Sequence, residues 1–263
     1  MGLFTRSGVA VVEFFGPIGS GGQVAEMARL LDDVGKKPHY QALVLDIDSP
    51  GGAVGGAEVL HARITKIAEA KPVVAFVRSM GASGGYYLAC AASKIITLPS
   101  SLVGSIGVIY LRPAMQELLE KLGVNLTVYK GGRYKDMTGF WRGPTPEEDD
   151  KFRSLIAEIH DNFIDVVAKG RKMPPERVRE LATGEIFTGR RARDLGLVDE
   201  IGDFDRALEI AGRMGDVQPR PLYIRPKRGL LERMAGRFGR GMAAGVAAEL
   251  EARMGGGFYY KLP

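Results

Sequence analysis

The chain contains 263 residues, of which 45% are hydrophobic and 25% charged, and it carries a formal net charge of +5 at pH 7. These values exclude an intrinsically disordered chain and predict one large α/β domain, or one domain with an appendage, that buries a sizeable core. The basic residues are spread along the sequence up to a cluster between Arg220 and Arg240, which favours a solvated face over a site for nucleic acid or anionic lipid. The single cysteine, Cys90, excludes an intrachain disulfide and is predicted to be a core residue because it lies in an apolar helix.

The first hundred residues alternate between strand-like and helix-like segments. Apolar runs predict four strands, at residues 9–15, 42–47, 73–77 and 94–98. Apolar residues at helical spacing predict two helices, at residues 23–34 and 56–70. The second of these helices has Val59, Leu60, Ile64 and Ile67 on one side and is ended by the proline at position 72.

The remainder continues this alternation and then changes in character. Helices are predicted at residues 113–122, 145–169 and 174–181, strands at 106–110 and 218–224, and a helix, glycine stop and short strand at 187–201. Basic, glycine-interrupted helical pieces follow at residues 230–254, with an apolar tail at 258–263. The pattern therefore predicts one α/β domain over residues 1–215. It also predicts a C-terminal extension over residues 216–263 that makes subunit contacts and ends in a flexible tail.

A glycine-rich turn, SMGASGGYY, follows the third predicted strand at residues 79–87. A strand that passes abruptly into a helix holds its turn residue at the helix N-terminus, where unpaired N–H groups and the helix dipole stabilise a developing negative charge. Ser83 occupies this position, and the glycines beside it allow a substrate backbone to come close. The same pattern is also that of an ordinary helix N-cap.

Three further segments accompany this turn: DIDSPGG at residues 46–52, GSIGV at 104–108 and GGRYKDM at 131–137. In this order the segments resemble those of the signal peptide peptidase A family of serine–lysine proteases, over about residues 9–210. The resemblance implies an α/β fold of the Clp-protease/crotonase type, a spiral of repeated strand-strand-helix units, here with a C-terminal helical appendage. It also implies a serine endopeptidase with Ser83 as nucleophile, Lys135 as general base and Ser105 as the residue that orients the lysine.

A serine nucleophile needs a base for its hydroxyl proton. None of the three histidines, His39, His61 and His160, lies within the motif segments. A Ser-His-Asp triad would therefore need a histidine from a distant part of the sequence. A lysine serves as base only in its neutral form, which burial without a carboxylate partner favours. We therefore predict that the side chain of Asp136 points away from the neighbouring Lys135.

The tetrahedral intermediate of amide hydrolysis needs two hydrogen-bond donors, and the SPGG turn offers backbone N–H groups at a helix start. Pro50 has no N–H to give. By the resemblance, the donors would be Gly52, in preference to Gly51, together with Gly84. The sequence PGG is also that of an ordinary turn. No metal, nucleotide or other cofactor is implied.

The resemblance implies short apolar peptides as substrates, such as signal-peptide remnants. In the family's short bacterial members the serine and the lysine of one site come from neighbouring subunits of a ring, so we expect a ring-shaped homo-oligomer with shared sites and no nucleic-acid partner. The sequence shows neither a signal peptide nor the ~20 apolar residues that a membrane helix needs, which predicts a cytoplasmic location or peripheral association with a membrane surface.

Two other functions stay open at this point. One is a crotonase-like acyl-CoA hydratase or isomerase, which shares the oxyanion-binding turn but works through carboxylates and would not need Ser83 or Lys135. The other is a non-catalytic scaffold partner of a membrane protein. An active-serine probe discriminates both from a peptidase.

Overall fold

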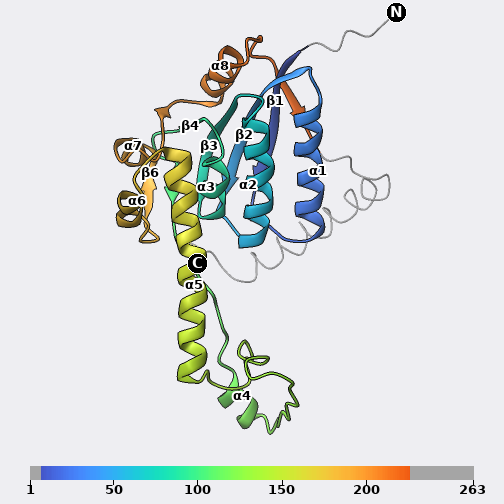
Figure 1. The fold of residues 1–263 in the computed structure, drawn as a ribbon, viewed down its shortest axis with the longest axis vertical. Helices are drawn as coiled ribbons and strands as arrows, with labels where there is room; N and C mark the ends of the chain where they lie inside the picture. Colours follow the sequence, from blue (N-terminus) through green and yellow to red (C-terminus); the bar gives the residue numbers. More distant parts are fainter. Residues whose placement is uncertain (1–6, 226–263) are drawn as a thin grey trace, which may run out of the picture. The chain divides into compact units, whose positions relative to one another are not determined.

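The structure is a computed structural model that describes residues 7–225 (Figure 1). Its internal contacts divide the chain into two units, Met1–Ile224 and Arg225–Pro263. The first unit carries all the elements described below. The predicted helical pieces at residues 230–254 and the apolar tail at 258–263 lie outside the described residues.

A largely parallel β-sheet forms the centre of the first unit, as the sequence predicted. Within residues 7–225 its eight strands are β1 (Gly8–Phe15), β2 (Tyr40–Ser49), β3 (Val73–Ala82), β4 (Lys94–Thr97), β5 (Leu102–Gly104), β6 (Ile186–Thr188), β7 (Glu200–Ile201) and β8 (Pro221–Ile224). The main path runs β6-β5-β3-β2-β1-β8, and only the pair β5–β6 is antiparallel among these described strands. The sheet forks at β3, because residues 74–77 pair with β4 and residues 80–82 pair with β5.

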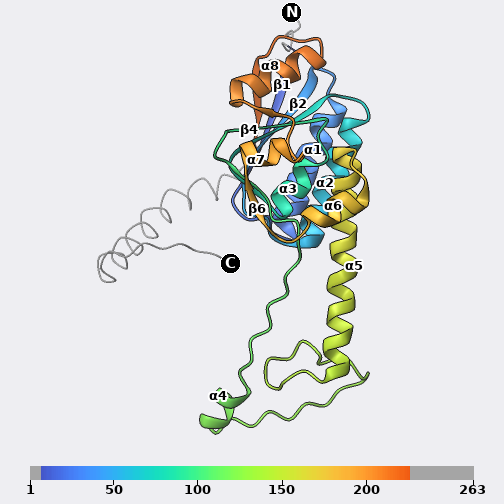
Figure 2. The same ribbon diagram turned by 90° about the vertical axis from the view of Figure 1, so that its left-hand side faces the viewer.

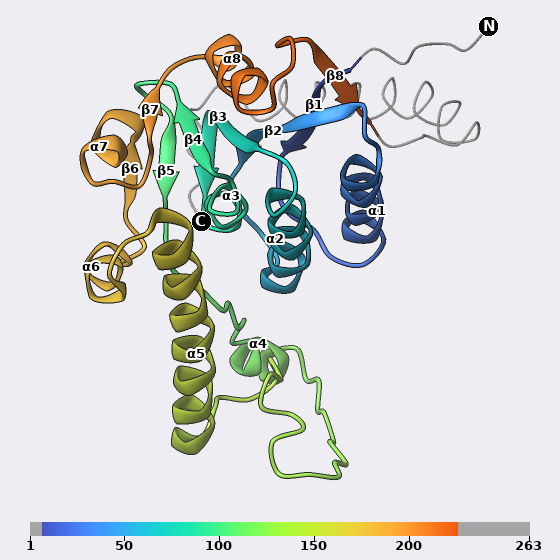
Figure 3. The same cartoon turned by 45° about the horizontal axis from the view of Figure 1, so that its top comes forward.

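Helices cover both faces of the sheet (Figure 3). They are α1 (Gly22–Lys36), α2 (Val54–Ala68), α3 (Gly84–Ala89), α4 (Gln116–Lys121), α5 (Pro146–Arg171), α6 (Pro175–Leu181), α7 (Gly189–Asp194) and α8 (Phe204–Met214). Alternate residues of β1 enter different cores: Val9 and Val11 pack with α8, whereas Ala10, Val12 and Phe14 belong to the larger core with α1, α2 and α3. This period of two, with both faces apolar, is what a strand inside an α/β sandwich requires.

Most of the predicted elements are confirmed, including the first four strands and the helices that became α1, α2, α5 and α6. Two predictions need small corrections. Val59 is 46% exposed, because adjacent helical residues are about 100° apart around the axis, which turns Val59 away from the α2 face formed by the buried Leu60, Ile64 and Ile67. The helix predicted at residues 113–122 is shorter, since α4 covers only Gln116–Lys121.

The strand predicted at residues 106–110 is wrong. The chain forms β5 before this point and then leaves the sheet at Gly104 and Ser105, whose φ angles are 101° and 51°. Positive φ at two consecutive positions is incompatible with an extended strand. Ile106 remains buried in the core, but Ile109 is 72% exposed, so the apolar run continues outside the sheet.

Helix α5 connects the sheet to the segment that precedes it (Figure 2). It begins with a capping box, in which the Thr145 side chain accepts from the Glu148 amide and the Glu148 side chain accepts from the Thr145 amide. Its buried apolar residues, Phe163, Ile164 and Val167, all lie in the last third. The first half of α5 therefore packs against residues 109–145, which we call the arm, and not against the core of the sheet.

An ion pair between a buried carboxylate and a partly exposed arginine joins neighbouring strands on the α8 side. Asp46 of β2 is fully buried and accepts two hydrogen bonds of 2.7 Å from the guanidinium of Arg78 on β3. The guanidinium also lies within 6 Å of the ring centres of Phe15, Phe76 and Phe204. Burial raises the pKa of Asp46, and Arg78 opposes this increase.

Arg78→Leu is expected to lower the free energy of unfolding by about 3 kcal/mol, because it leaves the buried Asp46 carboxylate without its partner. Urea denaturation followed by circular dichroism measures this. The matched control is Arg63→Leu, which removes an exposed pair with Asp32 and should cost less than about 1 kcal/mol. Equal effects of the two substitutions would contradict the assigned role of Arg78.

Candidate active site

Ser83 lies where β3 passes directly into α3. Its φ and ψ angles are 50° and −120°, a combination that non-glycine residues rarely adopt. Two hydrogen bonds hold it there: its amide donates to the Gly104 carbonyl (2.8 Å), and its carbonyl accepts from the Tyr87 amide (2.9 Å). Backbone strain of this kind costs about 1–3 kcal/mol and persists at functional sites where the surroundings enforce it.

The turn after β2 lies against the Ser83 turn. Gly51 has a φ of +98°, and a Cβ atom at this position would be 2.7 Å from the Gly84 nitrogen and 2.8 Å from the Ser83 Cβ. Glycine is therefore required here both by the backbone angle and by the contact. Gly85 is similarly close to the end of β2, since a Cβ there would be 2.8 Å from the Ser49 carbonyl oxygen. Gly51 and Gly85 thus allow the turn after β2 and the Ser83 turn to come into contact.

The hydrogen bonds of this turn decide which glycine amide is free. The Gly51 amide donates to the Ser49 hydroxyl (3.2 Å), and the Gly51 carbonyl accepts from Ile18 (2.7 Å). Ala53 donates to the Ile18 carbonyl (2.9 Å), so Ile18 is bonded to the residues on either side of Gly52 in a parallel bridge. In such a bridge the Gly52 amide points away from Ile18, and it has no partner within residues 7–225. The geometry therefore favours Gly52 over Gly51 as a donor, in line with the sequence-based preference.

A second free amide borders the same space. Gly84 is the first residue of α3, and the amides of the first helical turn have no partner inside the helix. A Cβ atom at Gly84 would be 3.4 Å from the Gly52 nitrogen, so the two backbone groups lie side by side next to Ser83. Two adjacent N–H donors at a helix N-terminus suit an oxyanion that develops on a carbonyl carbon attacked by the serine.

A cleft opens beside Ser83 with mainly apolar walls. They are formed by Val54 and Ala57 of α2, Tyr87 of α3, Val108, and Ile159 and Phe163 of α5. Glu58 is the one charged residue among those that line this cleft. Burial raises the pKa of Tyr87, with a smaller contribution from the Glu58 carboxylate, which keeps the phenol neutral. The cleft is therefore suited to an uncharged, apolar side chain.

Ser105 lies beside the Ser83 turn. It has a φ of 51° and donates its amide to the Glu185 carbonyl (2.7 Å), while its predecessor Gly104 accepts from Ser83. Among residues 7–225, Ser83 and Ser105 are two of the four non-glycine residues with positive φ, and the other two, Lys172 and Asp216, follow helix ends. The structure thus places both predicted serines on adjoining, conformationally constrained turns.

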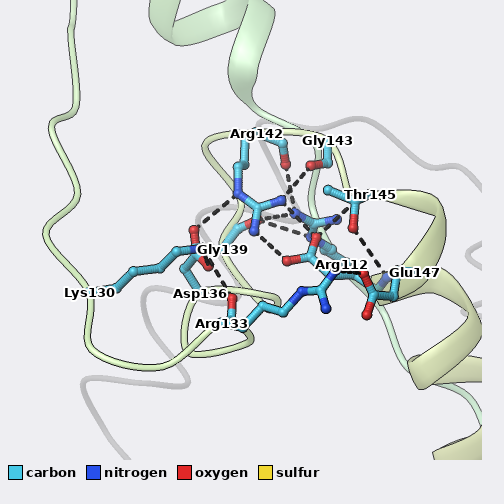
Figure 4. Close-up of polar contacts among 10 residues, drawn as sticks. Arg112, Lys130, Arg133, Asp136, Gly139, Arg142, Gly143, Thr145 and Glu147 are labelled. Carbon is cyan, nitrogen blue, oxygen red and sulfur yellow. Dashed lines mark hydrogen bonds and ion pairs between the residues drawn. The ribbon is translucent and has the colours of Figure 1, made fainter.

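Lys135 lies elsewhere, on the exposed surface of the arm. Its ammonium has no hydrogen bond or ion pair within residues 7–225, and it does not line the Ser83 cleft. Residues beside it tie it to the start of α5, because Arg133 pairs with Glu147 (Figure 4). Tyr134 donates to the same carboxylate. From Glu147 to Ile159, the first α5 residue at the cleft, the helix rises by about 18 Å. One chain in this conformation therefore does not bring Ser83 and Lys135 together.

Comparisons with known proteins show the family of this chain. Residues 65–218 match peptidase family S49. The chain belongs to this family. It is 38% identical over 215 residues to "Putative protease slr0021" of Synechocystis sp., covering 82% of this chain and 77% of that protein. It is 33% identical over 216 residues to the chloroplastic serine protease SPPA of Arabidopsis thaliana (81% and 32%), and 34% identical over 258 residues to the Na(+)/H(+) antiporter NhaA of Brucella abortus (95% and 35%).

Family S49, the signal peptide peptidase A family, consists of serine peptidases with a Ser-Lys dyad. The chain is therefore an S49 serine peptidase, and the hydratase alternative is set aside. It spans about three quarters of the cyanobacterial relative and about a third of the other two. Within residues 7–225 no helix is long and apolar enough to cross a membrane, and no group of three metal-ligating side chains occurs.

No histidine lines the cleft beside Ser83 within the described part of the chain. The ring of His61 lies 5.0 Å from that of the cleft residue Tyr87, and burial lowers the pKa of His61. His39 packs on Tyr40 instead. Cys90 is buried at the end of α3, and burial raises the pKa of its thiol to about 12, so it is a core residue as predicted.

The residues that form the cleft walls were not predicted from the sequence. Ile159 and Phe163 lie four residues apart and so share one face of α5, which the sequence pattern allows. Nothing local indicates that this face meets α3, more than seventy residues earlier in the chain. Ile18, whose backbone orients the Gly51 turn, was likewise not identified.

Gly51→Ala is expected to reduce peptidase activity by about 100-fold or more, because the new methyl group would displace the Ser83 turn and the Gly84 amide. Steady-state hydrolysis of a fluorogenic peptide measures this. The control is Gly55→Ala on α2, where a Cβ atom meets nothing within 4 Å and which should retain activity and fold. Full activity of Gly51→Ala would show that the contact between the turns is not required.

Proposed function

We propose that this S49 peptidase is a serine endopeptidase that hydrolyses short apolar peptides, such as signal-peptide remnants, through a Ser83 acyl-enzyme. The observation that carries the proposal is the strained Ser83 at the start of α3, beside the free amides of Gly52 and Gly84. The apolar walls of the adjoining cleft support an apolar substrate side chain.

In the proposed mechanism the Ser83 hydroxyl attacks the scissile carbonyl carbon while neutral Lys135 takes its proton. The amides of Gly52 and Gly84 donate to the oxyanion of the tetrahedral intermediate. The C–N bond then breaks, and the lysine ammonium returns the proton to the leaving amine. Water, deprotonated by the same lysine, hydrolyses the ester and releases Ser83. Ser105 is proposed to orient the lysine amine beside the nucleophile, and Gly51 supports the turn without donating to the oxyanion.

We propose further that Lys135 reaches Ser83 from a neighbouring subunit of a ring-shaped homo-oligomer. The separation within one chain supports this, because Lys135 is held near the start of α5 and the cleft lies beside its second half. The surface of the arm supports it as well. Several of its apolar side chains are strongly exposed, among them Ile109 (72%), Leu111 (76%) and Tyr129 (93%), which is typical of a surface that a partner covers.

The match to the Brucella antiporter supports a second candidate role, as a partner of a membrane protein. That relative aligns with 95% of this chain, although the aligned part is only 35% of its own length. An association of this chain with a membrane protein at a membrane surface is consistent with that match. Labelling by an active-serine phosphonate discriminates: labelling that disappears in Ser83→Ala supports the peptidase, and absence of labelling at any pH supports a scaffold.

Ser83→Ala and Lys135→Ala are each expected to lower peptide hydrolysis by about 10³-fold or more without unfolding the protein, because the two residues act as one unit. If the dyad is shared, an equal mixture of the two variants, after subunit exchange, should recover activity at about a quarter of its sites. Hydrolysis of a fluorogenic peptide before and after mixing measures this. A fully active monomer, or a mixture without recovery, would contradict the shared dyad.

The rate is expected to rise with pH through neutrality into the alkaline range, because the working form of Lys135 is neutral and proton loss produces it. The pH dependence of kcat/KM measures this on the free enzyme. A midpoint near ~6.5, the ordinary value for histidine, would point to a histidine base. His61→Gln serves as the control, and its profile should match that of the unmodified protein.

A further inference from the structure

The loop that carries Lys135 also carries a carboxylate next to it. Asp136 directly follows Lys135 in the sequence. A lysine stem is long and flexible enough for its ammonium to pair with an unoccupied neighbouring carboxylate. Such a pair stabilises the charged lysine and so opposes its use as a base. The charge of Asp136 therefore has to be bound by something else.

Both oxygens of this carboxylate are bound by other cations (Figure 4). Oδ1 of Asp136 accepts from the Lys130 ammonium, and Oδ2 accepts from Nε of Arg142 at 3.1 Å. The residue is 8% exposed, so water has little access to it. The hydrogen bonds from Arg142 and Lys130 hold the pKa of Asp136 well below its usual range. Lys135, by contrast, stays exposed and unpaired within the described residues.

Arg142 is itself fixed in place. Its guanidinium donates to both oxygens of Glu148, at 2.5 and 2.7 Å, and its carbonyl accepts from Arg112 at 2.7 Å. Glu148 is only 3% exposed and belongs to the capping box of α5. A single side chain thus connects Asp136, the neighbour of the proposed base, to the start of a 26-residue helix.

The other charged groups around this loop have partners of their own. Arg133 and Tyr134 both bind Glu147, and Lys151 lies over the Tyr134 ring. Arg142 holds the pKa of Glu148 at about 2, with help from the Thr145 amide. Asp136 and Glu148 therefore remain ionised throughout a neutral-to-alkaline assay, and neither of them supplies a titration in that range.

We propose that Arg142 and Lys130 are positioning residues for the Lys135 base: by occupying the two oxygens of Asp136, they prevent this carboxylate from pairing with the adjacent ammonium. The proposal rests on the proposed function of Lys135. It assigns Asp136 a role in fixing the loop, with its carboxylate directed toward the start of α5 and away from Lys135.

The test is the pH profile of kcat/KM for the full chain. Arg142→Ala releases one oxygen of Asp136, which becomes available to Lys135, so the alkaline midpoint should move upward by about one pH unit. Activity at neutral pH should then fall about tenfold and recover at high pH. Lys130→Met releases the other oxygen and should move the midpoint in the same direction, which keeps the test valid if Arg142→Ala folds poorly.

Asp136→Asn in each of these backgrounds separates positioning from a structural effect. With the carboxylate removed, the midpoint should return close to that of the unmodified protein. Arg179→Ala, which removes an exposed ion pair with Asp161 on α5, is the matched control and should leave the midpoint unchanged.

The outcomes distinguish this inference from the proposed function. Full activity of Lys135→Ala would overturn both. If Lys135→Ala is inactive but Arg142→Ala and Lys130→Met lose rate equally at every pH, with an unmoved midpoint, the positioning role is wrong and the dyad stands. A midpoint shift that persists after Asp136→Asn also overturns the positioning role.

Discussion

The contact between two glycine turns is the constraint on which the site depends. β2 and β3 are parallel neighbours, so their C-terminal ends lie at the same edge of the sheet, where ligands bind in such folds. The register shift between Ile47 and Ser49 carries β3 further before it turns, and Ser83 then lies directly against Gly51. Side chains at Gly51 or Gly85 would separate the turns. The Ser83 conformation and the two adjacent amides all follow from this approach.

Helix α5 divides the proposed chemistry between two regions. Its second half contributes Ile159 and Phe163 to the cleft wall and ends in the core, while its capped start holds the loop with Lys135. A helix is stiff over this length because every interior amide is bonded within it. The proposed nucleophile and base are thus held apart in one chain, and the exposed apolar surface of the arm supports the proposal that a second chain bridges this separation.

The buried carboxylates of the sheet and of the arm are stabilised in the same way. Asp46 in the sheet and Asp136 in the arm are each bound by an arginine, and in each case the arginine is held by further contacts: aromatic rings around Arg78, and Glu148 beside Arg142. An unpaired buried charge is costly, so these arginines fix local geometry as well as charge. In the arm this arrangement agrees with the sequence-based expectation that Asp136 points away from Lys135.

The sequence by itself determined the local features. Apolar runs and helical spacing predicted β1 to β4 and α1, α2 and α5, because periodicity is a property of short segments. Turn chemistry together with the family resemblance singled out Ser83, Gly51 and Gly52. It failed at residues 106–110, where an apolar run leaves the sheet because backbone angles at Gly104 and Ser105 turn it away. The tertiary structure alone decided that Gly52 has the free amide, that α5 forms one wall of the cleft, and that Lys135 lies far from Ser83 in one chain. These depend on which faces and edges meet across long stretches of chain, and local sequence does not encode such long-range contacts.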